Sequence, residues 1–417
     1  MKTNYIHILI GLLYLTGCNK SDDSTWQQNE LQNEPPLSFD LVDVPDGAED
    51  VDVTPTLTWE SAKNPKGGNV TYDLYLGTET NPTTPYESGI ANTSLEITDR
   101  LNLLTDYYWK VVATDAEERS SQSPVHKFST RTLNLSEVPI VEAPGFTPRF
   151  GHTSVVFENK IWVISGDTGD FGPNDIWYSE NGIDWLLAIA SPAFSHRSGH
   201  TSVVYDDKIW VIGGFSKNDV LYSSDGILWE QATEQANFSE RRGHTSVVFK
   251  NKMWVIGGDG EDFKNDVWFS SDGINWELAT ASAGFPVSSG HSTVVFDDKL
   301  WVIGGHNTGS ARNDIWYSSD GIQLSAVAQP PPFTGRTNHS TTVFGGKIWI
   351  VGGRNGNKID ENEVWYSDDG MSWHQFMYSS SFKKKIHAHS TVVFQDRIMV
   401  LGGFQEYGLN DEVWTLD

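Results

Sequence analysis

Residues 199–214 read GHTSVVYDDKIWVIGG, and this stretch decides the fold because versions of it occur six times. The runs Thr201–Tyr205 and Ile209–Ile212 are rich in β-branched and aromatic residues, which favour strands. The polar pair Asp206-Asp207 between them suits the tight turn of a hairpin. Each copy is led by a histidine, and successive histidines are 44 to 50 residues apart: His152, His200, His244, His291, His339 and His389. A fixed period of this length indicates a stack or ring of small β-sheets.

The rest of each repeat supplies two further strands. A glycine pair such as Gly257-Gly258 follows the second strand, and glycine there permits positive φ or close backbone approach. A variable loop leads to a third strand such as Asn265–Ser270, and the turn Asp272-Gly273 precedes a fourth that begins at Trp276. Four strands per repeat predict six four-stranded blades.

The glycine pairs and recurring tryptophans resemble the kelch repeat, so residues 133–417 are similar to kelch-type six-bladed β-propellers such as the central domain of galactose oxidase. The last repeat stops at its third strand, Glu412–Trp414. Ser136–Val141, just ahead of the first repeat, has the length and pattern of the missing fourth strand. We therefore expect an all-β protein whose propeller is closed by an N-terminal strand, since closure hides both open edges.

Residues 39–132 precede this region and alternate with period two, for instance in Tyr72–Gly77 and Tyr107–Ala113. Such alternation predicts antiparallel strands. Trp59 on an early strand, with Tyr107 leading into a late strand as a tyrosine-corner candidate, resembles a fibronectin type III domain. We expect an antiparallel β-sandwich that acts as a spacer.

The first residues look like an export signal. Lys2 precedes an apolar run, Ile6–Leu15, that is too short to span a bilayer. Leu15-Thr16-Gly17-Cys18 resembles the bacterial lipobox, which implies that residues 1–17 are a lipoprotein signal peptide and that Cys18 is lipidated. Cys18 is the only cysteine, so no disulfide forms within the chain.

Residues 18–38 are polar and lack apolar periodicity, which predicts a flexible stalk. The pair Asp22-Asp23 resembles the signal that carries some lipoproteins to the surface of Gram-negative bacteria. We expect an extracytoplasmic protein anchored by lipid to the bacterial outer membrane and displayed on the cell surface.

The charge narrows the range of partners. Lys and Arg total 29 against 55 Asp and Glu, a formal net charge of -26, which disfavours nucleic acid. The six histidines recur once per blade, too widely spaced for a metal cluster, and serve the blade instead. We expect no metal, no cofactor and a monomer.

Two groups of residues are candidates for ligand binding on the propeller face that carries the variable loops. Four repeats place an arginine just before their first strand, and arginine forks suit the carboxylate of an acidic sugar or a C-terminus. The alternative is that these arginines hydrogen-bond neighbouring loops. They are Arg149, Arg197, Arg241 and Arg336. The second group breaks the repeat in the loops between second and third strands: Phe215, Asp259, His306, Arg354, Phe404 and Tyr407.

These features favour a surface-displayed binding or adhesion module for a glycan or a protein over an enzyme. A copper radical oxidase is excluded because its cofactor joins a tyrosine to a cysteine, and this chain has no cysteine besides the expected lipid anchor Cys18. A sugar epimerase or mutarotase remains an alternative by fold resemblance, with Arg241, Arg336, Glu361 and Glu406 as candidate carboxylate clamp and general acid or base. A structural role in an envelope complex is the third interpretation.

Overall fold

The computed structural model describes residues 34–417 except 135, 137, 170, 171, 173, 309, 377–384, 406 and 407. The signal peptide, Cys18 and most of the predicted stalk therefore lie outside the described residues. The described part consists of strands and their connections, and it contains no helix that is long and apolar enough to cross a membrane. It forms two compact units. The boundary between them lies between Arg131 and Thr132, and residues 101–103 belong to the second unit.

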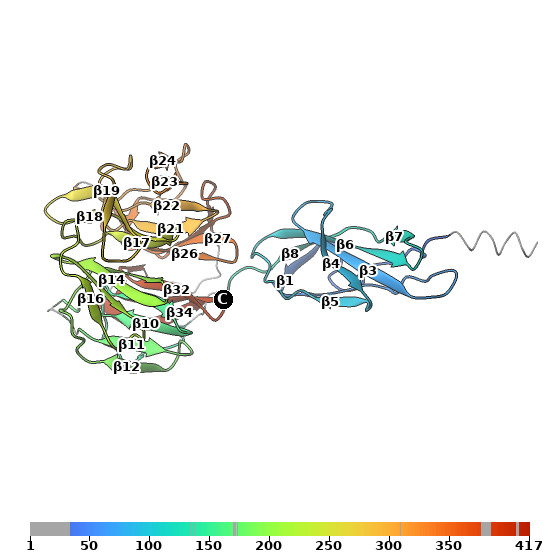
Figure 1. Ribbon diagram of the computed structural model, residues 1–417, viewed down its shortest axis with the longest axis horizontal. Coiled ribbons are helices and arrows are strands. Elements are labelled where there is room, and N and C mark those ends of the chain that lie inside the picture. The colour runs from blue at the N-terminus through green and yellow to red at the C-terminus, as the bar shows by residue number, and fades with distance from the viewer. Residues whose placement is uncertain are drawn as a thin grey trace, which may run out of the picture. The chain divides into compact units, whose positions relative to one another are not determined.

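The first unit is a β-sandwich (Figure 1). One sheet has the order β1-β8-β6-β3-β4 with β7 beside β6, and the second sheet pairs β2 with β5. Trp59 lies edge-on to Tyr72 with ring centres 5.6 Å apart, and Trp109 is fully buried. All pairings are antiparallel except β1 with β8. Membership of the fibronectin type III family stays a prediction. The strands are β1 (Ala48–Val51), β2 (Thr56–Thr58), β3 (Val70–Gly77), β4 (Pro85–Ile90), β5 (Ser94–Glu96), β6 (Asp106–Asp115), β7 (Ser120–Gln122) and β8 (His126–Thr130).

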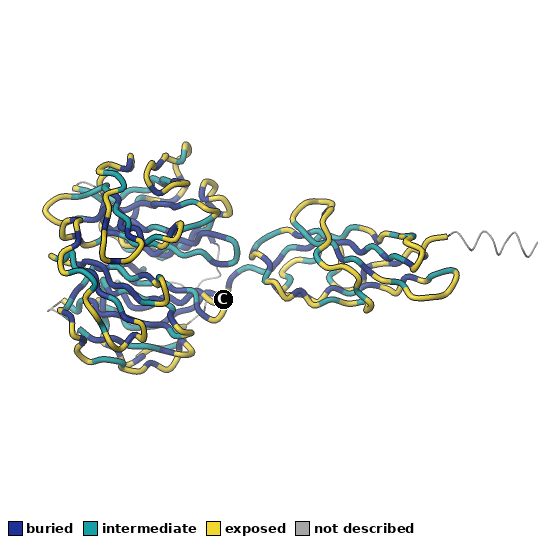
Figure 2. Tube along the Cα trace, viewed as in Figure 1, coloured by how far each residue is buried: buried dark blue, intermediate teal, exposed yellow. Residues whose placement is uncertain are grey.

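The second unit contains six antiparallel blades. Each blade begins with the histidine-led strand. Its second strand is mostly buried, whereas its connecting loops are more exposed (Figure 2). The first three blades are β9 (Thr153–Phe157), β10 (Lys160–Ile164), β11 (Ile176–Ser179), β12 (Trp185–Ile189); β13 (Thr201–Tyr205), β14 (Lys208–Gly214), β15 (Lys217–Ser223), β16 (Glu230–Thr233); and β17 (Thr245–Phe249), β18 (Lys252–Asp259), β19 (Phe263–Ser270), β20 (Glu277–Thr280).

The remaining three blades follow the same plan, with short extra pairings β25–β28 and β31–β33 at the ends of the fifth and sixth blades. Their strands are β21 (Ser292–Phe296), β22 (Lys299–Ile303), β23 (Ile315–Ser318), β24 (Ser325–Ala326); β25 (Arg336–Thr337), β26 (Ser340–Phe344), β27 (Lys347–Val351), β28 (Arg354–Asn355), β29 (Val364–Ser367), β30 (His374–Gln375); and β31 (Ile386–His387), β32 (Ser390–Phe394), β33 (Arg397–Gln405), β34 (Gly408–Leu416).

The inner strands form a closed cycle. Strand β9 contacts β13, and contacts continue through β17, β21, β26 and β32 back to β9. Two rings of hydrogen bonds follow the same cycle. In one, the backbone N–H of each residue before a repeat histidine donates to the equivalent carbonyl in the neighbouring blade, at 2.8 to 3.4 Å. In the other, the histidine Nε2 lies 2.7 to 3.1 Å from a Ser or Thr hydroxyl of the neighbouring blade.

The last blade takes its outer strand from upstream, as the sequence predicts. Ile140 N donates to Val413 O at 2.8 Å, and Val413 N donates to Val141 O at 3.0 Å. Asn134 and Asp417 exchange two further backbone hydrogen bonds. The prediction of an all-β fold with a six-bladed propeller closed by an N-terminal strand is confirmed.

Candidate functional site

The four repeat arginines lie beneath the surface rather than on it. Arg149, Arg197, Arg241 and Arg336 are at most 1% exposed. Each one pairs with a carboxylate at the start of the third strand of its own blade. Arg241 makes a two-pronged contact in which Nη1 and Nη2 each lie 2.9 Å from an oxygen of Asp266. The other three pairs are Arg149 with Asp175, Arg197 with Asp219 and Arg336 with Glu363.

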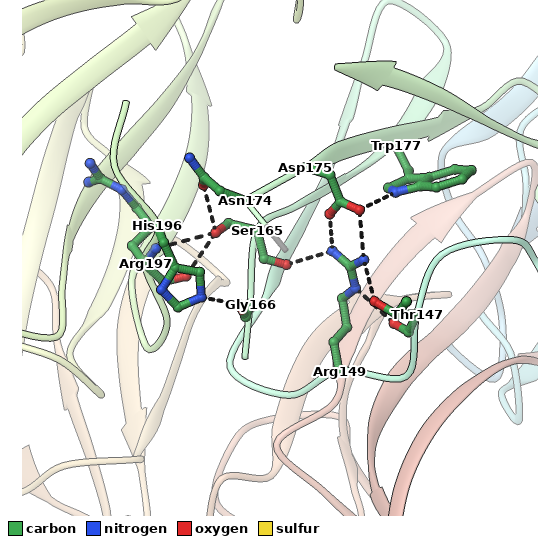
Figure 3. A network of polar contacts seen from close by, with 9 residues as sticks. All are labelled: Thr147, Arg149, Ser165, Gly166, Asn174, Asp175, Trp177, His196 and Arg197. Atoms are coloured by element: carbon green, nitrogen blue, oxygen red, sulfur yellow. Dashed lines mark hydrogen bonds and ion pairs between the residues drawn. The ribbon is translucent and has the colours of Figure 1, made fainter. Parts of the chain in front are cut away.

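Further contacts occupy these guanidinium groups. Nη1 also donates to the backbone carbonyl of the first residue at the glycine-pair position. For Arg149 this acceptor is Ser165 O, at 2.9 Å (Figure 3). A phenylalanine three residues earlier covers each guanidinium at 5.1 to 5.5 Å. This geometry matches the alternative interpretation of these arginines, in which they hydrogen-bond neighbouring loops instead of a ligand. The ligand surface proposed below does not include them.

Twelve residues at the mouth of the propeller occupy equivalent positions, two per blade. One member of each pair follows the arginine position, and the other follows the glycine pair. A backbone bridge or hydrogen bond joins the two, for example Arg242 with Asp259 and His387 with Phe404. We call these the mouth residues: Phe150 with Asp167, Ser198 with Phe215, Arg242 with Asp259, Ser289 with His306, Thr337 with Arg354, and His387 with Phe404.

The mouth residues share a backbone scaffold but differ in charge, size and aromatic character between blades. A position that serves the blade tends to keep its side chain, and the arginine position does so in four of the six blades, whereas a recognition surface varies. Five loop residues that the sequence predicts lie here at one equivalent position: Phe215, Asp259, His306, Arg354 and Phe404. Tyr407, Glu406, Asp170 and Phe171 lie outside the described residues.

A cleft of ≈ 460 Å³ opens between the second and third blades at the mouth. Connections of both blades contribute to it, together with the end of β18 and Lys264 of β19. Its lining is polar apart from one aromatic ring and consists of Phe215, Ser216, Ser239, Glu240, Arg242, Asp259, Gly260, Glu261 and Lys264.

Four mouth residues organise this cleft. The Arg242 guanidinium lies 4.8 Å from the centre of the Phe215 ring, and its Nε lies 3.4 Å from Asp259 Oδ2. Ser289 Oγ donates to Asp259 Oδ1 at 2.8 Å, which fixes the carboxylate from the other side. Phe215 is 55% exposed and the Arg242 side chain 51%. An exposed aromatic face beside fixed charges can stack on a sugar ring or a peptide side chain and hydrogen-bond its polar groups.

Phe215 and Asp259 are among the ligand residues that the sequence predicts, whereas Ser216, Ser239, Glu240, Gly260 and Lys264 are not. Arg242 follows Arg241 directly, and the two differ completely, since Arg241 is enclosed and Arg242 is open to solvent. The sequence distinguishes the two positions by their variation. The equivalent of position 241 is arginine in four of the six blades, whereas the equivalent of position 242 is arginine in none of the other five. Glu240 and Lys264 gave no such signal.

A second cluster joins the fifth and sixth blades. His387 Nδ1 lies 3.0 Å from Asp360 Oδ1, and Arg354 Nε lies 3.5 Å from the same oxygen. The imidazole stacks on Phe404 at 5.0 Å with an interplanar angle of 10°, and Phe150 packs on Phe404 at 4.6 Å. Burial lowers the pKa of His387, although the charge of Asp360 opposes this. A carboxylate beside a ring nitrogen orients an imidazole for proton transfer.

His306 lies between these two clusters and is held in place by its neighbours. Its Nδ1 is 2.9 Å from both Ser289 O and Thr337 Oγ1, and Phe263 packs edge-on against the ring. Within the described ranges, no group of three or more His, Cys, Asp and Glu residues is arranged to hold a metal ion.

The fold and its mouth define a class: a six-bladed β-propeller with a conserved scaffold inside each blade and variable residues at one end of the ring. Comparison with known proteins gives the family. The chain belongs to the family described as KLHDC2/KLHL20/DRC7 Kelch-repeats domain, whose model matches residues 111–269 and 225–403. This confirms the kelch resemblance of the repeats.

Among solved structures, the chain is similar to one titled "Structure of YjhT", with a TM-score of 0.54 and 17% sequence identity. The match covers 67% of this chain and 97% of that chain. At this identity the likeness shows the fold alone. No curated protein matches the chain.

Proposed function

We propose that the propeller is a binding module that holds a glycan or protein ligand at its mouth, with the cleft between the second and third blades as the main contact site. The kelch-repeat fold supports a role as a binding module. The observation that carries the proposal is a contrast between two kinds of position. The arginine position is a buried arginine in four of the six blades, whereas the twelve mouth residues vary on a common scaffold. Phe215, Arg242 and Asp259 provide the aromatic, cationic and anionic contacts.

We further propose that lipid at Cys18 anchors this module to the bacterial outer membrane, with residues 18–38 as stalk and the sandwich as spacer. The support is the sequence Leu15–Cys18 and the polar stretch that follows it. Expression in a Gram-negative host with radiolabelled palmitate should label the protein, and Cys18→Ser should abolish the label. Protease treatment of intact cells should degrade a surface-displayed protein and spare a protein that faces the periplasm.

Ligand binding is testable with the soluble chain from Ser38 onward, screened on glycan arrays and by pull-down from envelope extracts. The leading proposal predicts a ligand whose binding falls at least about tenfold in Phe215→Ala and in Arg242→Ala, because each substitution removes a side chain that would contact the ligand in the cleft. Ile274→Ala is a matched control, since Ile274 is also 55% exposed but lies on a turn outside the cleft. Equal loss in all three variants, or binding unchanged by the two cleft variants, would contradict the assignment. Stable capture of envelope proteins alone would favour the structural role.

An enzyme remains the second candidate, and the pair His387–Asp360 beside Arg354 is the observation that favours it. The residues first considered for epimerase chemistry fit less well. Arg241 and Arg336 are enclosed in ion pairs, Glu361 accepts hydrogen bonds from Asn355 and Thr334, and Glu406 lies outside the described residues. Anomer exchange of sugars followed by NMR, accelerated by the wild type and not by His387→Asn, would establish this function. No acceleration for any sugar bound in the screen would remove it.

A further inference from the structure

One position on the third strand of the blades departs from its five equivalents. In five blades it is a tryptophan whose indole Nε1–H donates to the carboxylate two residues earlier. The distances are 2.8 Å for Trp177 to Asp175, 2.8 Å for Trp268 to Asp266, 2.7 Å for Trp316 to Asp314, 2.8 Å for Trp365 to Glu363 and 3.1 Å for Trp414 to Glu412. In the second blade the residue is Leu221, which cannot donate to Asp219.

The packing around this position also changes. In other blades the phenylalanine that covers the arginine contacts the tryptophan ring edge-on, as Phe238 does with Trp268 at 6.4 Å and Phe333 with Trp365 at 5.7 Å. The equivalent Phe194 meets the shorter Leu221 instead, and a cleft of ≈ 340 Å³ opens there. Its lining is Ala193, Phe194, Ser195, Asp219, Leu221, Trp229 and Gln231.

The carboxylate in this cleft keeps capacity to accept a hydrogen bond. Asp219 receives Nη1 and Nη2 of Arg197 at 3.0 and 2.9 Å. A carboxylate accepts up to about four hydrogen bonds, and the equivalent Asp266 accepts a third from Trp268. The Asp219 side chain is 18% exposed, so a ligand in the cleft can reach it.

We propose that this cleft binds a ligand through an indole ring with a free N–H. The ring would lie where the five tryptophans lie, with Phe194 and Trp229 as aromatic walls and Leu221 as its floor. Its N–H would donate to Asp219. Phe194 and Trp229 are edge-on to each other at 5.3 Å, as Phe238 and Trp276 are at 5.2 Å in the third blade, where Trp268 packs against Phe238. The site shares no lining residue with the cleft at the mouth, so it stands independently of the function proposed above.

Paired probes test the ring and its N–H separately on the purified full-length protein. Indole should bind saturably with one site per chain by isothermal titration or ligand-observed NMR. N-methylindole should bind at least about fivefold more weakly, because it keeps the ring but cannot donate to Asp219. N-acetyl-tryptophanamide distinguishes the source: binding tighter than that of indole indicates a tryptophan side chain of a partner, and weaker binding indicates free indole. No saturable binding of either probe, or equal affinity for indole and N-methylindole, would overturn the proposal.

Two substitutions locate the site. Leu221→Trp restores the residue of the other blades and should abolish indole binding while leaving the circular dichroism spectrum unchanged. Trp268→Leu should create a second site, because it exposes Asp266, Phe238 and Trp276 in the third blade as Leu221 exposes their equivalents in the second. The stoichiometry of indole binding should then rise from one to two. Indole binding that persists in a folded Leu221→Trp protein, or one site in a folded Trp268→Leu protein, would place the ligand elsewhere.

Discussion

Two adjacent arginines illustrate how the same residue type takes opposite roles in this propeller. Arg241 is enclosed and holds Asp266 in a two-pronged contact, while Arg242 lies half exposed on Phe215. Burial alone would raise the pKa of Asp266, but hydrogen bonds and the charge of Arg241 outweigh burial and lower it. The Arg241–Asp266 contact is therefore part of the stability of the blade, whereas Arg242 is available to a ligand.

At the residue scale we predict that Arg241→Ala lowers the free energy of unfolding by about 3 to 5 kcal/mol, because it leaves a largely buried carboxylate without its counterion. Arg242→Ala should change it by less than about 1 kcal/mol, since exposed ion pairs contribute little. Urea denaturation of the two variants beside the wild type measures both values. Equal destabilisation by the two substitutions would show that burial does not separate their roles.

The sequence could place these arginines in the repeat but not their partners. Asp266 is 25 residues from Arg241, and only the assembled blade shows that the third strand brings a carboxylate against each buried guanidinium. The substitution of Leu221 for tryptophan is visible in the sequence. Whether neighbouring side chains close over the shorter residue or leave a cleft depends on packing, which periodicity does not report.

At the scale of elements, the residue types at turns and strand ends were enough to predict the hairpins, the glycine pairs and the closing strand. The turn residues Asp206 and Asp207 adopt φ of 48° and 52°, the positive values that a type I′ hairpin requires. Gly257 has a φ of 57°, and a Cβ there would lie 2.9 Å from the His291 ring, so only glycine fits where two blades meet. The closing strand was also predictable, because an unpaired edge on the last blade demands a partner.

We predict that Ile140→Pro weakens the closure of the ring. Proline removes the N–H that donates to Val413 O at 2.8 Å, so the free energy of unfolding should fall by about 1 to 3 kcal/mol. Val138→Pro is the control within the same segment, because Val138 is 66% exposed and should tolerate the change. Thermal unfolding and hydrogen exchange of the β34 amides would follow the effect. Faster exchange across β34 in Ile140→Pro alone is expected, and identical behaviour of both variants would contradict the proposed importance of this strand.

At the scale of the whole molecule, the six repeat histidines form a continuous ring of hydrogen bonds through every blade and across the closure. Burial lowers the pKa of His152, His244 and His389 to about 3 and that of His291 to about 4. The pKa values of His200 and His339 lie well below the usual value for the same reason. Folding therefore keeps all six imidazoles neutral at pH values where the unfolded chain binds protons on them.

The lowered pKa values of these histidines set the direction in which stability depends on pH. Above about pH 6.5 the histidines are neutral in both states and contribute no slope. As pH falls below that value, the unfolded chain takes up protons that the folded chain excludes, so each buried histidine removes about 1.4 kcal/mol of stability per pH unit until its folded pKa is reached. Urea denaturation between pH 7.5 and 4.5 should show a steep loss of stability, well before the carboxylates titrate. His244→Gln should make the slope shallower, because it removes one of the six ring imidazoles. Stability that stays flat from pH 7 to pH 5 would mean that protonated histidines fit within the ring.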